Sequence, residues 1–250
     1  MSGLEIAGAT ALVTGASRGF GRGIATALSQ AGAQVTGVAR DPGPLAELHA
    51  ELGGSFTAVA ADAADPNVAG RLIDTCRPRI LVLNAGATPL PRPIQQHTWE
   101  TFGRNWDVDV RHAFGWTREA LLAPLAPGSI VISLSSGAAL RGSPLSGGYA
   151  GAKAAIRWLT AYAAQESARE GLGIRFVSVL PQLTPATGLG APAVAAYAAR
   201  QGVDVATYTE NQGPALTPEQ VGKAITDLAT GAAPAQGAYL LTAAGLRQLT

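Results

Sequence analysis

The sequence contains one cysteine and only three histidines in 250 residues. Cys76 alone can form neither an internal disulfide nor a cysteine metal cluster. The three histidines, His49, His97 and His112, show no metal-ligand spacing such as H-E-x-x-H. We therefore predict that the chain has no metal site.

Neither one sign of charge nor long apolar runs dominate the chain. Eighteen basic residues against seventeen acidic ones leave a net charge of +1, so no global field favours a nucleic acid or an acidic membrane. No apolar run reaches the roughly 18 residues that indicate a membrane span. The N-terminal MSGLEIAG lacks the basic start and apolar core of a secretory signal. We expect a soluble, cytoplasmic protein without a nucleic-acid or membrane partner.

Short apolar runs alternate with longer helical patterns, and 47% of the residues are hydrophobic while 14% are charged. This length and composition suit a single domain over residues 1–250. The predicted strands are Ala9–Thr14, Gln34–Ala39, Phe56–Ala60, Ile80–Leu83, Ser129–Leu134, Ile174–Val179 and Tyr239–Thr242. The predicted helices are Gly19–Ala31, Pro44–Leu52, Pro66–Cys76, Thr98–Leu122, Gly148–Glu170 and Thr217–Ala229. The alternation predicts an α/β fold with a doubly wound, Rossmann-like parallel sheet of about seven strands and helices on both faces.

Residues 181–214 form the least regular part of the sequence. They are rich in Pro, Gly, Ala and Thr, with one short helix predicted near Ala193–Gln201. An irregular stretch of this length inside a compact domain is usually a functional lid or binding loop. We predict a substrate lid, with a solvent-exposed connection as the alternative.

The stretch LVTGASRGFGRG, from Leu12 to Gly23, fits two motifs. Gly15, Ser17 and Gly19 match the G-x-S-x-G elbow of many hydrolases, but Ser17 follows the first strand and no histidine comes after His112 to complete a triad. Gly15, Gly19 and Gly21 also match a glycine turn that lets a pyrophosphate approach a helix N-terminus. The position after the first strand favours phosphate binding.

Tyr149 and Lys153 are one helical turn apart, so both side chains project from the same face. An isolated phenol is a poor acid–base catalyst at neutral pH. A neighbouring ammonium favours the phenolate, and the pair can then give a proton to a ketone or take one from an alcohol.

Together these motifs resemble the short-chain dehydrogenase/reductase family, in its compact, single-domain branch. The shared pattern is Thr14-Gly15-x-x-x-Gly19-x-Gly21, Asn84-Ala85-Gly86, Ser136 and Tyr149-x-x-x-Lys153. The resemblance implies that Ser136 holds the substrate oxygen beside Tyr149, while Lys153 binds the cofactor ribose. Ser135 is the rival serine, but its side chain should point to the opposite face of an extended strand.

One position departs from the family pattern. The fourth catalytic member of the family is an asparagine, and the matching position in WDVDVRHAF is Asp109. Asn105 lies four residues too early. A carboxylate accepts a hydrogen bond from a relay water but cannot donate one. It can also pair with Lys153 and offset its effect on Tyr149.

The cofactor suggested by the residues is NADP(H). NAD-specific relatives carry an acidic residue at the end of the second strand, where this chain has Ala39 followed by Arg40. Arg18 and Arg40 suit a 2′-phosphate, although Asp41 is a complication. Asp62 resembles the family aspartate that binds adenine. The full predicted cofactor set is Gly15, Ser17, Arg18, Gly19, Gly21, Arg40, Asp62, Asn84, Ala85, Gly86, Tyr149 and Lys153.

The resemblance also implies a substrate pocket and an assembly. The pocket wall should include Ala138, Leu145, Gln182, Leu183 and parts of the lid at residues 181–214. Gln182 replaces the usual glycine of a Pro-Gly pair. A stripe at helical spacing, Trp99, Phe102 and Trp106, is typical of a core. In the family, however, this helix commonly pairs across a subunit boundary, so we expect a homodimer or homotetramer.

The sequence therefore predicts an NADPH-dependent oxidoreductase that reduces a ketone or aldehyde to an alcohol, or works in reverse. The substrate is expected to be a small, apolar or moderately polar carbonyl compound. The alternative is a cofactor-binding sensor or assembly protein with weak or no redox activity, which the departures at Asp109 and Gln182 motivate.

Overall fold

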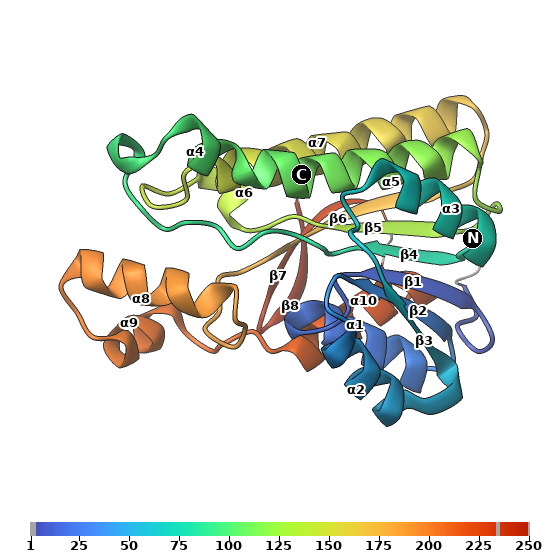
Figure 1. The fold of residues 1–250 in the computed structure, drawn as a ribbon, viewed down its shortest axis with the longest axis horizontal. Helices are drawn as coiled ribbons and strands as arrows, with labels where there is room; N and C mark the ends of the chain where they lie inside the picture. Colours follow the sequence, from blue (N-terminus) through green and yellow to red (C-terminus); the bar gives the residue numbers. More distant parts are fainter. Residues whose placement is uncertain (1–3, 234–235, 250) are drawn as a thin grey trace.

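The computed structural model describes residues 4–233 and 236–249. Its strands are β1 (Thr10–Thr14), β2 (Gln34–Ala39), β3 (Phe56–Ala60), β4 (Ile80–Leu83), β5 (Ile130–Leu134), β6 (Arg175–Pro181), β7 (Gly237–Thr242) and β8 (Gly245–Leu249). They form one sheet in the order β3-β2-β1-β4-β5-β6-β7-β8 (Figure 1). All neighbouring strands are parallel except the β7–β8 pair. The predicted Rossmann-like α/β fold is confirmed.

Helices cover both faces of the sheet (Figure 1). On one face lie α1 (Gly19–Gln30), α2 (Pro42–Leu52) and α10 (Pro218–Thr230), and on the other lie α3 (Pro66–Cys76), α5 (Arg111–Leu122) and α7 (Gly148–Arg169). Each face has its own apolar cluster, one containing Ile24 and Ile225 and the other containing Leu72 and Trp116. Because both faces are covered, β4 and β5 are buried along their whole length, which accounts for their continuous apolar sequence.

The predicted strands are all present, with ends that differ by at most two residues. The antiparallel strand β8 is an addition to the seven predicted ones. Its sequence, GLRQL, is mostly exposed at the edge of the sheet. It therefore lacks the apolar run by which a strand buried on both faces can be detected. The short helix α6 (Ala138–Arg141) and the 3-10 helices η1 (Gly53–Ser55) and η2 (Ile94–Gln96) were also not predicted.

The predicted helix Thr98–Leu122 is present as one unbroken run of helical residues, but it is not α-helical throughout. It consists of α4 (Trp99–Asn105), a π-helical turn η3 (Trp106–Val110) and α5. Two buried polar side chains on this stretch bond the loop after β4: Asn105 Nδ2 donates to the Ala87 carbonyl at 2.8 Å, and Asp109 Oδ1 accepts from the Ala87 amide at 2.7 Å. A π turn widens the helix by one residue and is frequent at functional sites. It places Asp109 against this loop.

Residues 181–214 are more regular than the sequence predicted. They contain α8 (Gly190–Gln201) and α9 (Val205–Gln212), which lie beyond the carboxyl ends of the strands, at the left in Figure 1. Val194, Ala198 and Tyr208 form a small apolar cluster between these two helices. Two hydrogen bonds connect the beginning of the segment to its end. Gln182 Nε2 donates to the Pro214 carbonyl at 2.9 Å, and Thr184 Oγ1 donates to the Leu216 carbonyl at 2.8 Å.

The aromatic stripe on α4 and η3 does not lie in the core, although aromatic side chains at helical spacing usually do. Trp99 is 83% exposed and Trp106 is 42% exposed. Further exposed aromatic side chains lie on α5 and α7, namely Phe114, Trp158 and Tyr162. In the described part of the chain, no helix has the length and apolar character needed to cross a membrane.

Candidate active site

A cavity of about 810 Å³ opens at the carboxyl ends of the parallel strands. The order of the sheet reverses between β1 and β4, and ligands of such sheets bind in the crevice outside this switch point. The cavity wall combines the loops after β1, β4 and β5 with the beginning of α7 and the segment that contains α8 and α9. A volume of this size is typical of ligand and cofactor sites.

The glycine loop after β1 is packed so tightly that side chains would not fit. A Cβ on Gly21 would lie 2.0 Å from the Gly15 carbonyl oxygen, and one on Gly15 would lie 2.9 Å from Ala85 Cα. Asn84 Nδ2 donates to the Thr14 and Gly15 carbonyls at 3.1 Å each. The first turn of α1 carries no acidic residue, so the positive end of its dipole faces the cavity without neutralisation. The loop therefore fits a pyrophosphate.

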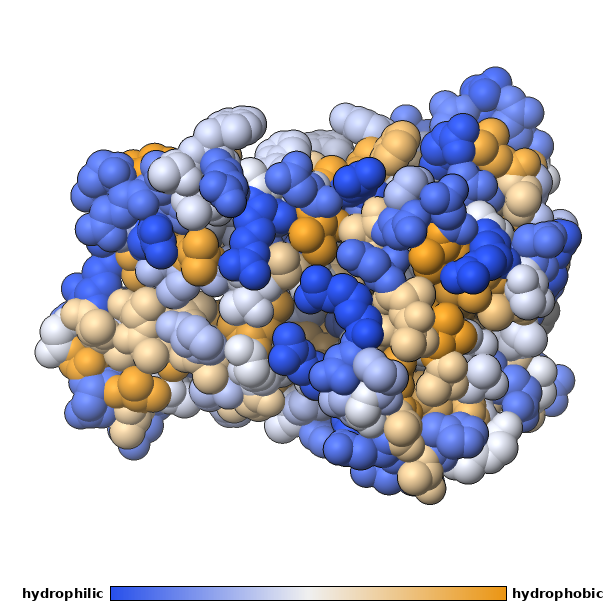
Figure 2. Space-filling view, viewed as in Figure 1, coloured by the Kyte–Doolittle hydropathy of each residue, from blue (hydrophilic) through white to orange (hydrophobic). Residues whose placement is uncertain are grey.

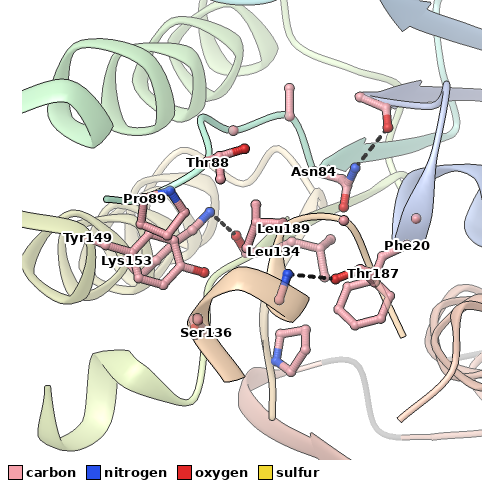
Figure 3. A pocket seen from close by; sticks show the side chains of 18 of the residues that line it. Phe20, Asn84, Thr88, Pro89, Leu134, Ser136, Tyr149, Lys153, Thr187 and Leu189 are labelled. Atoms are coloured by element: carbon pink, nitrogen blue, oxygen red, sulfur yellow. Dashed lines mark hydrogen bonds between the residues drawn. The ribbon is translucent and has the colours of Figure 1, made fainter. Parts of the chain in front are cut away.

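Three side chains of the predicted catalytic group meet in the cavity wall: Ser136, Tyr149 and Lys153 (Figure 3). Tyr149 and Lys153 project from the same face of α7, and Lys153 Nζ lies 5.6 Å from the centre of the Tyr149 ring. Lys153 Nζ donates to the Leu134 carbonyl at 3.2 Å, which fixes the ammonium beside the end of β5. This geometry can hold a positive charge next to a phenol.

The two serines after β5 have different environments. Ser135 Oγ donates to the Lys153 carbonyl at 2.7 Å and is buried, so it joins β5 to α7. Ser136 Oγ accepts from the Ala138 amide at 3.2 Å and keeps its hydroxyl proton available for a ligand. The geometry supports Ser136 over Ser135 as the group that contacts a substrate.

Asp109 lies behind the cavity wall and pairs with the buried ammonium. Its Oδ2 is 3.2 Å from Lys153 Nζ, in an ion-pair contact that is not aligned as a hydrogen bond. Asp109 is fully buried and Lys153 is 5% exposed. Burial opposes the charged form of Lys153, but attraction to Asp109 and Tyr149 raises the pKa of Lys153 above its usual value. The ammonium therefore stays charged at neutral pH.

His112 is a cavity residue that the sequence analysis did not place in the site. It follows Asp109 by one helical turn, lines the cavity and is 2% exposed. Burial, with a smaller contribution from the positive charge of Lys153, lowers the pKa of His112 to about 3. The imidazole is therefore neutral at physiological pH, and it packs edge-on against Trp116 with ring centres 6.2 Å apart. The sequence could have indicated this position, because His112 follows Asp109 by three residues and therefore lies on the same face of the helix.

The far end of the cavity contains the residues predicted to bind the adenosine part of a cofactor. Arg18, Arg40 and Asp62 all line it. Both arginines are exposed, and neither forms an ion pair within residues 4–233 and 236–249. Asp41 also lines the cavity, but its Oδ1 accepts from the Gly43 amide at 3.0 Å as the N-cap of α2. The carboxylate is thus engaged by the helix.

The structure brings nearly all predicted site residues to this one cavity. Ala138, Leu145, Gln182 and Leu183 line it, together with Gly15, Ser17, Gly19, Asn84, Ala85 and Gly86. Gly21 lies beneath the glycine loop, and Asp109 lies behind Lys153. Ser143, Tyr197 and Tyr208 also line the cavity. Tyr197 and Tyr208 belong to the segment 181–214 that was predicted as a substrate lid, but neither they nor Ser143 were predicted individually, because no motif marks them.

Comparison with known proteins identifies the family. The model of the short chain dehydrogenase family matches residues 9–198. The chain belongs to this family. It is 32% identical over 185 residues to the L-xylulose reductase of Bos taurus, covering 73% of this chain and 75% of the relative. These matches show an oxidoreductase of the short-chain dehydrogenase/reductase family, whose members bind NAD(P)(H) and act on small molecules.

Two solved structures of short-chain dehydrogenases have the same architecture. A putative NAD(P)-dependent gluconate 5-dehydrogenase from Beutenbergia cavernae, with bound NADP at low occupancy, is 30% identical with a TM-score of 0.77, covering 93% of this chain and 95% of that one. A 3-ketoacyl-(acyl-carrier-protein) reductase from Brucella melitensis, complexed with NADH, is 25% identical with a TM-score of 0.75, covering 93% and 96%. The family thus includes members with either nucleotide.

Proposed function

We propose that this chain reduces a ketone or aldehyde to an alcohol, or catalyses the reverse reaction, with NADP(H) as its cofactor. The observation that carries this proposal is the meeting of Ser136, Tyr149 and Lys153 in the cavity that also contains the glycine loop. A phenol, a buried ammonium and a hydroxyl with a free proton are the groups needed to exchange a proton at a carbonyl oxygen.

In the proposed reaction the Ser136 hydroxyl donates a hydrogen bond to the substrate oxygen and holds it beside Tyr149. The Tyr149 phenol gives its proton to the oxygen during reduction and takes it back during oxidation. Lys153 favours the phenolate through its charge and is the residue that would bind the nicotinamide ribose. A bound nicotinamide supplies or accepts the hydride.

The preference for NADP(H) rests on the two arginines at the adenosine end. Guanidinium groups bind phosphates through charge-assisted, often bidentate hydrogen bonds. Arg18 and Arg40 are exposed beside the cavity, and the nearby Asp41 carboxylate is engaged in capping α2. The position that carries an acid in NAD-specific relatives is Ala39. This arrangement favours a nucleotide with a 2′-phosphate over one with a free 2′-hydroxyl.

The proposed assembly is a homodimer or homotetramer built on the outer face of α5 and α7. Phe114 on α5 is 53% exposed, while Trp158 and Tyr162 on α7 are 56% and 55% exposed. The Trp158 and Tyr162 rings stack with centres 6.3 Å apart. Aromatic side chains are enriched in the buried centres of protein interfaces, so a second copy of the chain is the partner that we propose for this face.

The direct test is a panel of uncharged ketones and aldehydes incubated with the protein and NADPH. We expect loss of the absorbance of the reduced nicotinamide with at least one compound, and a slower reaction with NADH. The alternative function, a cofactor-binding sensor, is favoured by the ion pair between Asp109 and Lys153, which partly cancels the charge next to Tyr149. Tight NADPH binding without turnover of any carbonyl compound would support the sensor.

A further inference from the structure

The segment that contains α8 and α9 is joined to the opposite wall of the cavity by two hydroxyl groups. Tyr197 on α8 hydrogen-bonds through its phenol to the Ser143 hydroxyl, in the loop between α6 and α7. Both residues line the cavity, and this loop leads directly into the helix that carries Tyr149. The Ser143–Tyr197 pair therefore lies between the proposed lid and the proposed catalytic helix.

Tyr197 is held in place by a second aromatic ring. It stacks on Tyr208 of α9, with ring centres 6.3 Å apart and planes 12° apart, and Tyr208 is 5% exposed. Burial raises the pKa of Tyr197, and the Tyr208 and Tyr149 phenols add to this against the opposing charge of Arg200. Tyr197 therefore keeps its proton at neutral pH and lies within electrostatic reach of Tyr149.

Charged side chains are distributed unevenly around the cavity. Arg18, Arg40, Asp41 and Asp62 lie at the adenosine end, and Lys153 is paired with Asp109. Within the described residues, the remaining wall carries no acidic, lysine or arginine side chain and includes Pro89, Leu145, Leu183, Leu189, Tyr197 and Tyr208. Arg200, one helical turn after Tyr197 on α8, is exposed and does not line the cavity. Figure 2 shows mostly apolar or weakly polar residues over α8 and α9.

This wall has consequences for the ligand that it accepts. A carboxylate or phosphate buried against it would lose its hydration without meeting a counter-charge, which is costly. When the Ser143 hydroxyl donates to the Tyr197 oxygen, the Tyr197 proton remains available, so Tyr197 is the donor that a ligand oxygen meets. The aromatic rings and leucines offer apolar contact to the rest of the ligand.

We propose that the substrate is an uncharged ketone or aldehyde with an apolar body and a second oxygen atom, which is hydrogen-bonded by the Ser143–Tyr197 pair. This inference rests on the proposed function, because it assigns the substrate class of the same cavity. It makes Tyr197 a residue that determines specificity and takes no part in the proton exchange at Tyr149.

The test uses two matched pairs of probes. The first pair is α-hydroxyacetophenone and acetophenone, which differ by the second oxygen. The second pair is the methyl ester of β-benzoylpropionate and the free carboxylate, which differ by the charge. Each is measured as kcat/KM with NADPH, for the unmodified protein, Tyr197→Phe and Ser143→Ala. Thermal unfolding of each variant checks that the fold is retained.

For the unmodified protein we expect the ester to exceed the carboxylate by at least about tenfold, because an unpaired charge is penalised. In Tyr197→Phe the ratio of hydroxyketone to acetophenone should fall by roughly 2- to 12-fold, the range for a net neutral hydrogen bond. Acetophenone, which lacks the second oxygen, should lose less activity than the hydroxyketone in the same variant. Equal turnover of ester and carboxylate, or equal losses on both ketones in Tyr197→Phe, would overturn the proposal.

A binding measurement separates this inference from the proposed function. Calorimetric titration of the same ketones into the protein saturated with NADP⁺ measures recognition without turnover. The protein could reduce none of the probes, yet bind the hydroxyketone more tightly than acetophenone and lose this preference in Tyr197→Phe. That result would support the proposed substrate class and contradict the proposed reductase function. If no such preference exists, the substrate class is wrong regardless of turnover.

Discussion

At the scale of single residues, Asp109 distinguishes this site from the family pattern. The sequence allowed a carboxylate that accepts a hydrogen bond from a relay water and one that pairs with Lys153. The structure has the ion pair, with 3.2 Å between Oδ2 and Nζ, in a fully buried position. Gly86 leaves the room for it, since a Cβ there would lie 2.9 Å from Asp109 Oδ2. A negative charge at this point opposes the formation of the Tyr149 phenolate.

Asp109→Asn should therefore shift alcohol oxidation to lower pH. The substitution preserves shape and removes the negative charge that offsets Lys153, so the phenolate forms more readily. We expect the limb of the kcat profile on which the rate rises with pH, measured at saturating NADP, to move down by roughly one pH unit, equivalent to about 1.4 kcal/mol. The matched control is Asp107→Asn, an exposed position on the same π turn. An unchanged limb in Asp109→Asn would show that Asp109 does not influence Tyr149.

His112 should make the folded state sensitive to acid. Its pKa is lowered from 6.5 to about 3 in the folded protein, so below about pH 6.5 the unfolded chain binds a proton that the folded chain does not. Stability is then lost as pH falls from about 6.5 toward 3. Between about pH 7 and about pH 5 the loss attributable to this group is roughly 2 kcal/mol.

The measurement is urea unfolding of the unmodified protein and of His112→Gln at both pH values. We expect the variant to be less stable at neutral pH because it alters a buried contact, and its stability should depend less on pH by the amount given above. Parallel pH dependence in the two proteins would show that His112 is accessible to protons in the folded state.

Arg40 should distinguish the two nicotinamide nucleotides. In Arg40→Ala, NADPH binding should weaken by about 1.5–3 kcal/mol, the range for hydrogen bonds to charged groups, while NADH binding stays nearly unchanged. Fluorescence titration with each nucleotide measures this. Arg71→Ala, an exposed arginine on α3 outside the cavity, is the control. Equal losses for both nucleotides would remove Arg40 from the 2′-phosphate site.

At the scale of elements, the sequence predicted those whose pattern is local. Strands such as Gln34–Ala39 and Phe56–Ala60 and the helix Pro66–Cys76 have the predicted ends, because apolar runs and proline N-termini mark them directly. The π turn at Trp106–Val110 is accompanied by two bonds to the loop after β4, in which Asn105 donates to the Ala87 carbonyl and Asp109 accepts from the Ala87 amide. No helical pattern contains that information, since the partner belongs to another loop.

The aromatic face of α5 and α7 leads to a prediction about assembly. Trp158 and Tyr162 are each more than half exposed, and their burial in an interface would remove apolar area from water. The double substitution Trp158→Glu with Tyr162→Glu should convert the oligomer to a monomer in analytical ultracentrifugation. Gln30→Glu, at an exposed position on α1, should leave the mass unchanged. A monomeric unmodified protein, or an oligomer that survives the double substitution, would contradict the proposed interface.

At the scale of the whole molecule, the fold assembles the cavity from segments far apart in the sequence. The motifs predicted the parts that lie at strand ends, Ser136 and Asn84 among them, since the carboxyl ends of parallel strands meet at one edge. Tyr197 and Tyr208 could not be predicted in the same way. Their place in the wall depends on how α8 and α9 pack on each other, which the composition of this segment does not reveal.

The proposed function depends above all on proton exchange between Tyr149 and a substrate oxygen. The decisive experiment follows NADPH consumption by Tyr149→Phe with the best ketone of the panel, together with its NADPH affinity. We predict that kcat/KM falls by at least about 100-fold, the lower range of general acid–base catalysis, while NADPH affinity changes little and Tyr162→Phe remains active. Turnover by Tyr149→Phe close to that of the unmodified protein would contradict the account.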